Sequence, residues 1–208
     1  MHGETSQGIR MAQDEEKSVH QPTDEELIER FQHGNLQAFD LIVKRYKNQL
    51  LNFIFRFLGN QEEAEDLVQE TFLRVYKNRR AYRKVAKFST WIYTIAGNLA
   101  KTELRKRKRR KIFSITDLGY EEKDYEISDM AFSPEDQVNG LITEEIVQRE
   151  IEGLSPKFRE VIILRDIQEL SYEEISKIVR IPLGTVKSRV NRGRLKLQER
   201  LKPYLSRD

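Results

Sequence analysis

The apolar residues of this chain follow a helical repeat in two stretches, and the repeat fails between them. From residue 23 to 110, and again from 139 to 205, apolar side chains recur every three or four positions, the spacing of an amphipathic helix. Between 112 and 138, acids together with Gly119 and Pro134 replace this repeat, which is typical of a linker. The pattern therefore predicts an all-α protein with two small helical domains joined by a flexible acidic linker.

The predicted boundaries divide the chain into four segments. Residues 1–22 are polar and aperiodic and are predicted to form a disordered N-terminal extension. The other segments are the first domain at 23–111, the linker at 112–138 and the second domain at 139–208. In the first domain, Thr23 followed by three acids predicts a helix N-cap, and Gly59 predicts the end of a long helix. We expect three main helices there.

The composition excludes several classes of protein. The chain has no cysteine, which rules out disulfides, thiolate zinc sites and a cysteine nucleophile. Its three histidines are scattered, so neither a metal site nor a cofactor is expected. No apolar run reaches the length of a membrane span, and the N-terminus lacks the apolar core of a signal peptide. We therefore expect a cytoplasmic protein without membrane insertion.

The charge distribution indicates a polyanionic partner. The formal net charge is only +3, but the segment 101–111 reads KTELRKRKRRK, and residues 180–208 are rich in Lys and Arg. Acids concentrate instead at 62–70 and 117–136. Two basic patches separated by acidic stretches predict two contacts with nucleic acid.

The end of the second stretch predicts a helix-turn-helix. The residues 171–174 (SYEE) form a capping box for a short helix, 181–184 (IPLG) make the turn, and a basic helix follows at about 185–201. Val186 and Val190 belong to the inner stripe of this helix. The opposite side presents Thr185, Ser188, Asn191, Arg192 and Lys196, and Lys187 and Arg189 flank it. Such side chains suit base edges and phosphates in the major groove, although a solvated or protein-binding basic helix is the alternative.

A segment that mixes aromatic and basic residues, KFSTWIYTIAGNLAKTELRKRKRR, precedes the linker, and Ser89 or Thr90 is the expected N-cap of its helix. Phe88, Trp91 and Tyr93 cannot all face one core, because Trp91 and Tyr93 lie two positions apart on a helix. Aromatic side chains beside cations suit unstacked bases, each contributing about 1–3 kcal/mol. The segment therefore predicts contact with bases and phosphates. The alternatives are Trp91 as a core anchor and the cationic run as a solvated face.

A third segment, 61–78, carries an acidic face. Carboxylates at helical spacing could hold a metal or perform acid–base chemistry, but metal sites in bundles usually pair such acids with histidine, and none lies near. The chain also lacks a nucleophile motif and a phosphate-binding glycine loop, so we do not expect an enzyme. The acidic face fits a basic partner protein better, and it would repel DNA.

Four stretches, in this order, resemble the extracytoplasmic-function group of the sigma-70 family of bacterial sigma factors. They are AEDLVQETFLRVYKN, KFSTWIYTIAGNLAKTELRKRKRR, LSPKFREVIILRDIQELSYEEISKIV and IPLGTVKSRVNRGRLKLQERL. The resemblance implies that the first domain is sigma domain 2, which binds core RNA polymerase and recognises and melts the minus-ten promoter element. The second domain would be sigma domain 4, which reads the minus-thirty-five element.

The resemblance also assigns three sets of site residues. The polymerase-docking set is Ala64, Glu65, Asp66, Gln69, Glu70 and Phe72. The minus-ten set is Lys87, Phe88, Ser89, Trp91, Tyr93, Asn98, Lys101 and Arg105. The minus-thirty-five set is Thr185, Lys187, Ser188, Arg189, Asn191 and Arg192.

The resemblance implies a function without catalysis by this chain, in which binding energy drives strand opening and polymerase makes the RNA. The expected partners are core RNA polymerase, promoter DNA and an anti-sigma factor, and the free protein is expected to be a monomer. A helix-turn-helix regulator that needs no polymerase is the alternative. It would explain the second domain but leaves the acidic face and the aromatic segment without a role.

Overall fold

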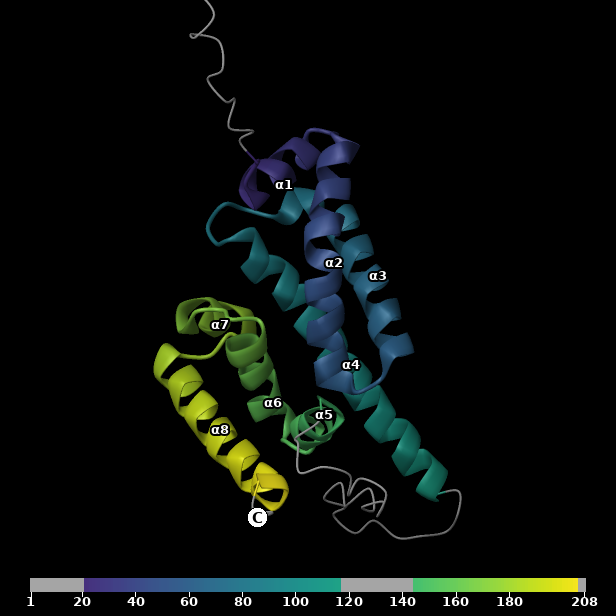
Figure 1. Cartoon of the computed structure of the whole chain (residues 1–208). Helices are drawn as coiled ribbons and strands as arrows, with labels where there is room; N and C mark the ends of the chain where they lie inside the picture. Colours follow the sequence, from purple (N-terminus) through teal and green to yellow (C-terminus); the bar gives the residue numbers. More distant parts are fainter. Residues whose placement is uncertain (1–20, 117–143, 206–208) are drawn as a thin grey trace, which may run out of the picture.

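The structure is a computed structural model that describes residues 21–116 and 144–205 (Figure 1). All regular structure within these two ranges is helical, as the sequence predicts. The predicted N-terminal extension and most of the predicted linker lie outside the described residues, at 1–20 and 117–143. No helix of the described ranges is long and apolar enough to cross a bilayer.

The N-terminal domain is a bundle of four helices. They are α1 (Asp24–Gln32), α2 (Leu36–Leu58), α3 (Gln61–Asn78) and α4 (Phe88–Thr116), with a 3₁₀ turn, η1 (Arg79–Ala81), after α3. The predicted cap at Thr23 is confirmed, since its hydroxyl accepts from the backbone N–H of Glu26 at 3.2 Å. The predicted helix end at Gly59 is also confirmed, because this residue has φ 71°, where glycine is unstrained.

Helix α4 differs from the prediction at both ends. It begins at Phe88, before the expected caps at Ser89 or Thr90. The helix can start there because a carboxylate of another helix, Glu25, accepts a hydrogen bond from the Phe88 N–H, with its Oε1 2.9 Å from the nitrogen. It ends at Thr116, inside the segment predicted as linker. The basic run 101–111 is therefore helical along its whole length.

The C-terminal domain contains the predicted helix-turn-helix. Its elements are α5 (Glu144–Glu152), α6 (Pro156–Ile162), a π-helical turn η3 (Ile163–Ile167), α7 (Tyr172–Val179) and α8 (Leu183–Leu205). The capping box at the start of α7 is present, with Ser171 and Glu174 bonded reciprocally. Helix α8 crosses α6 closely at Gly193, where a Cβ atom would lie 2.8 Å from a side-chain carbon of Ile162.

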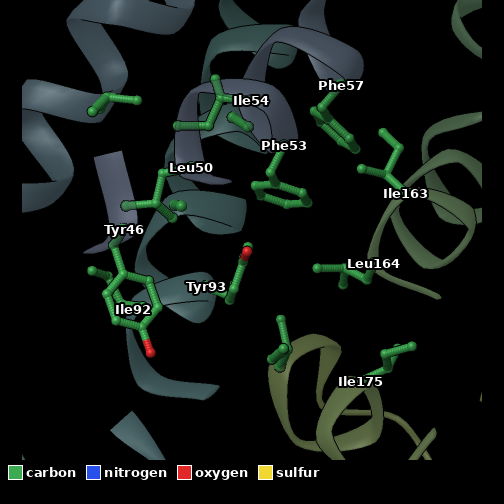
Figure 2. Close-up of a cluster of buried hydrophobic side chains, with 14 of the residues drawn as sticks. Tyr46, Leu50, Phe53, Ile54, Phe57, Ile92, Tyr93, Ile163, Leu164 and Ile175 are labelled. Carbon is green, nitrogen blue, oxygen red and sulfur yellow. The ribbon is translucent and has the colours of Figure 1, made fainter. Parts of the chain in front are cut away.

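The two domains lie against each other along α2 and α4 (Figures 1 and 2). Figure 2 shows apolar side chains of the N-terminal domain facing those of the C-terminal domain across this junction. Each is at most 2% exposed: Phe53, Phe57 and Tyr93 on one side, Ile163, Leu164 and Ile175 on the other. Burial of one such side chain stabilises a fold by roughly 1.5–3 kcal/mol, so the junction is a shared core and not a loose contact.

Arg159 of α6 ties the two domains at the junction through the backbone. It is 5% exposed, and its Nη1 donates to the carbonyl of Phe57 in the other domain at 2.6 Å. Its Nη2 donates to the carbonyls of Leu154, at 3.1 Å, and Glu152. Burial lowers the pKa of the guanidinium, so its charge is retained at a cost that the three carbonyls offset.

We expect Arg159→Met to destabilise the protein by about 1–3 kcal/mol, because it keeps the apolar stem and leaves buried carbonyls without a donor. Urea unfolding of the variant and the wild type measures the difference. Lys157→Met, on the exposed side of the same helix, is the matched control and should lie within about 0.5 kcal/mol of the wild type. Equal stability of the two variants would contradict the role given to Arg159.

Candidate nucleic-acid interface

The N-terminal half of α8 presents a polar and basic face to solvent. Val186 and Val190 are buried against the domain, which fixes the rotation of the helix. Of the predicted minus-thirty-five residues, Lys187, Ser188, Asn191 and Arg192 are exposed, and Thr185 and Arg189 are half-buried beside them. The structure thus brings four of the six residues to the open side of one helix and places the other two at its edges.

Contacts outside this face hold α8 in place. Arg194 donates to Asp166 of η3, with Nη2 2.5 Å and Nε 3.1 Å from the carboxylate oxygens. In the turn, Arg180 adopts φ 55°, and the Ser176 hydroxyl donates to the Ile181 carbonyl at 2.6 Å. The polar and basic face is therefore carried by a fixed helix and not by a loop, which would suit recognition of a rigid duplex.

The predicted minus-ten residues lie on different sides of α4. Phe88 is fully buried, and Trp91, which is half-buried, packs next to it with the ring centroids 5.9 Å apart. Tyr93 is also buried but points to the junction with the C-terminal domain (Figure 2). Lys87, Asn98 and Arg105 are exposed, whereas Ser89 and Lys101 are half-buried. The expectation that these three aromatics cannot all face one core is wrong, because Phe88 and Tyr93 belong to one continuous buried core and Trp91 packs against it.

An open cleft of about 300 Å³ lies between α3, η1 and α4. Its lining residues are Arg74, Asn78, Ala81, Trp91, Ile95 and Asn98. The cleft joins two predicted residues, Trp91 and Asn98, to polar side chains that the sequence analysis did not single out, Arg74 and Asn78. An aromatic ring, two amides and a guanidinium offer a flat base both a stacking surface and hydrogen-bonding groups.

The signal for the missed pair was present in the sequence. Arg74 and Asn78 are four apart and so lie on one face of α3, and Arg74 is oriented by Glu70, whose Oε1 lies 2.8 Å from its Nε. The sequence does not show that this face of α3 lies against Trp91 of α4, because that contact depends on how the two helices pack.

The cationic run of α4 contains both side chains bonded to other helices and side chains exposed to solvent. Arg107 is bound to Glu63 and to the carbonyl of Leu58, 2.7 Å from its Nη1. Arg105, Lys108 and Arg109 are exposed and line a second open cleft of about 540 Å³ with Thr102 and Ile112. These three cations continue from the first cleft along α4, so a strand leaving that cleft would meet positive charge.

The acidic face lies on α3, on the outside of the bundle. Glu65, Asp66 and Gln69 are exposed, and Glu70 is half-buried. Ala64 and Phe72 are buried, so they hold the helix against its neighbours and do not present atoms to a partner. Within the described residues, no group of three His, Cys, Asp or Glu side chains is arranged to hold a metal ion.

The comparisons with known proteins agree with this division. A family model described as Sigma-70 region 2 matches residues 42–110, and one described as Sigma-70, region 4 matches residues 144–197. The RNA polymerase sigma-H factor of Pseudomonas aeruginosa is 37% identical over 188 residues, covering 89% of this chain and 97% of that protein. The chain belongs to the sigma-70 family.

Further relatives place this sigma factor in the extracytoplasmic-function group. The ECF RNA polymerase sigma factor SigW of Bacillus subtilis is 40% identical over 177 residues, covering 84% of this chain and 95% of SigW. Among solved structures, the sigma factor RpoE of Bartonella quintana, in complex with the anti-sigma factor NepR, superposes with a TM-score of 0.63 at 28% identity. That match covers 82% of this chain and 99% of RpoE. As a member of this group, the protein directs initiation of transcription at promoters.

The region 2 match contains α3 and most of α2 and α4, and the region 4 match contains α5 to α7 and most of α8. Three predicted minus-ten residues of this sigma factor bond to side chains of the C-terminal domain. Lys87 Nζ lies 2.8 Å from Glu174 Oε1, the Tyr93 hydroxyl 2.6 Å from Gln168 Oε1, and Lys101 Nζ 3.0 Å from Glu160 Oε1.

The two carboxylates in these pairs are perturbed in opposite directions. Partial burial raises the pKa of Glu174, but hydrogen bonds from Lys87 and Ser171 outweigh this effect and lower the pKa to about 2. Burial raises the pKa of Glu160, and Lys101 only partly opposes that effect. Glu174 is therefore a stabilising charge at neutral pH, whereas ionised Glu160 is held at a cost.

We expect Glu174→Gln to destabilise the protein in a pH-dependent way. Since the folded-state pKa of Glu174 is depressed from 4.5 to about 2, its charge contributes stability above pH 4.5, and this contribution is lost as the pH falls toward 2. In urea unfolding, the gap between wild type and variant should be widest above pH 4.5 and shrink toward pH 2. The exposed neighbour Glu173→Gln is the control. A difference in the free energy of unfolding that stays constant with pH would contradict the stabilising role given to the Glu174 charge.

Proposed function

We propose that this sigma factor divides promoter recognition between the open face of α8 and the cleft beside Trp91, and docks on core RNA polymerase through α3. The observation that carries the proposal is the face of α8, where Asn191, Arg192 and Lys187 project from a helix whose other side is buried. Arg and Asn can form bidentate hydrogen bonds with guanine and adenine in the major groove. This face would read the minus-thirty-five element.

The cleft between α3 and α4 would take a base of the melted minus-ten strand. Trp91 supplies a stacking surface, and Asn78 and Asn98 can donate to and accept from the edge of a base. Arg105, Lys108 and Arg109 would then hold the phosphates that follow. Capture of an unstacked base stabilises the open strand without any covalent chemistry, so the chain acts by binding and polymerase makes the RNA.

The acidic face of α3 would bind core RNA polymerase. Its carboxylates repel phosphates, so it is suited to a protein partner with a basic surface. The face lies on a different helix from the cationic run of α4, so polymerase and promoter can be bound at the same time. Promoter recognition would take place in the cytoplasm, where RNA polymerase binds the chromosome.

Promoter binding by the minus-ten segment requires a rearrangement of the two domains. Lys87, Tyr93 and Lys101 cannot meet DNA while they bond to the C-terminal domain. We propose that the packed arrangement belongs to the free monomer, and that polymerase separates the domains. An anti-sigma factor, of the kind seen with RpoE of Bartonella quintana, would act on this sigma factor before that step.

The rival function, a helix-turn-helix regulator that needs no polymerase, uses only α7 and α8. It gives no role to the cleft beside Trp91, and none to the exposed carboxylates of α3. Tight and specific binding of the free protein to duplex promoter DNA would favour this rival.

We expect Arg192→Ala to weaken holoenzyme binding to promoters that carry the minus-thirty-five element by about 5- to 150-fold, the range of about 1–3 kcal/mol for a base contact. Binding is measured by gel shift with the native and with a scrambled upstream element, and the effect should vanish on the scrambled DNA. Lys157→Ala removes the same charge from α6 and is the control. An equal loss on both DNAs would identify Arg192 as a phosphate contact.

We expect Asp66→Lys to reduce affinity for core RNA polymerase by about tenfold or more, since a like charge placed against a basic surface costs at least ~1.4 kcal/mol. Asp40→Lys makes the same change at an exposed position of α2 and should bind as the wild type does. Fluorescence anisotropy of labelled protein titrated with core enzyme gives both values. Equal affinities would move the docking surface away from α3.

A further inference from the structure

Helix α1 lies outside the residues matched by the region 2 model, yet it bonds to both walls of the cleft beside Trp91. We propose that α1 is a spacer that sets the width of this cleft, with Gln32 and Glu25 as positioning residues for recognition of the minus-ten element. The inference rests on the proposed function of the cleft as the site of a melted base. Neither residue lines the cleft, so each acts through the backbone it holds.

Gln32 holds one wall of the cleft. Its amide Nε2 donates to the carbonyls of Arg79, at 2.7 Å, and Tyr82, at 3.2 Å. These two carbonyls flank Ala81, which lines the cleft together with Trp91. The side chain is half-buried, so its two bonds are partly shielded from competing water. Gln32 therefore fixes the turn η1 and the position of Ala81.

Glu25 holds the other wall. Its Oε1 accepts from the backbone N–H of Phe88 at 2.9 Å, at the first residue of α4. The residue before α4 is Lys87, whose side chain only donates, so α4 has no local acceptor at this end. A carboxylate here supplies both the missing acceptor and a charge that the helix dipole favours. Trp91 follows one turn later, so Glu25 fixes its position.

The helix between these two side chains is rigid. Glu25 and Gln32 are seven residues apart, which is roughly 10 Å along a helix. Leu27, Ile28 and Phe31 are buried beneath α1. Its start is tied to α2 as well, since Asp24 accepts from the Tyr46 hydroxyl at 2.5 Å and from Arg45 at 2.7 Å. The two anchors therefore sit at a fixed separation.

The loop between the two walls is held at its base by buried Tyr82, whose hydroxyl donates to the Ala86 carbonyl at 2.8 Å and whose ring packs on Phe88 and Trp91. Its tip has weaker contacts. At the tip of the loop 82–87, Val85 is 87% exposed, and Lys84 forms an exposed ion pair with Glu29, which contributes little. Ordering such a loop on binding costs conformational entropy, and that cost weakens discrimination between correct and incorrect bases. A loop already fixed by α1 avoids this cost.

The test compares promoters that carry native and single-base-substituted minus-ten elements, using runoff transcription by holoenzyme made with each variant. Gln32→Met keeps the length of the side chain and removes both donors, and we expect it to lower the minus-ten discrimination ratio by about tenfold. Glu25→Ala should do the same, and Glu25→Gln, which keeps an acceptor oxygen, should restore most of the ratio. Discrimination at the minus-thirty-five element and affinity for core polymerase should not change.

Arg30→Met, at an exposed position of the same helix, is the matched control and should keep the wild-type ratio. The inference is overturned if Gln32→Met and Glu25→Ala keep the wild-type ratio, or if discrimination falls equally at both promoter elements, which would indicate a purely structural role. Trp91→Ala and Asn98→Ala distinguish a failure of this inference from a failure of the proposed function of the cleft. If those two variants also keep the ratio, the cleft is not the minus-ten site; if they lose it while Gln32→Met does not, only the role of α1 is refuted.

Discussion

The fold depends on one helix, α4, that is packed on more than one side. Its 3.6-residue repeat distributes side chains over three stripes. Ile92, Ala96 and Ala100 form the stripe that is buried within the N-terminal domain. Tyr93 and Lys101 belong to the stripe that faces the C-terminal domain, through Gln168 and Glu160.

The third stripe of α4 stays open, and the candidate site lies there. Trp91, Ile95 and Asn98 line the first cleft, and Thr102 and Arg105 the second. Because the other two stripes are fixed by packing, the rotation of α4 about its axis is determined, and with it the direction in which the open stripe points. Binding energy from a base or a phosphate is then not spent on ordering the helix.

The local structure was predictable wherever a residue and its partner are near in sequence. The caps at Thr23 and Ser171, the end of α2 at Gly59 and the helix-turn-helix all follow from side chains within four positions of each other. The start of α4 was not predictable in this way, because the residue that caps it, Glu25, lies 63 positions away in the sequence. The same limit applies to the cleft, since Arg74 and Trp91 meet only through the packing of α3 on α4. The packing of the domains was beyond prediction as well, because Arg159 finds Phe57 across 102 positions.

The polar contacts at the junction bear on the proposed separation of the two domains. Lys101 is held by Glu160, a carboxylate whose burial raises its pKa and therefore costs free energy at neutral pH. If Lys101 moves from this partner to a phosphate of the promoter, the lysine keeps an anion while Glu160 regains water. Lys87 loses a stronger partner, Glu174, whose low pKa marks a well-stabilised charge, so this pair favours the packed state. The two pairs thus oppose each other. In the proposed separation, the shared apolar core around Phe53 and Leu164 is the main contact that polymerase would have to replace.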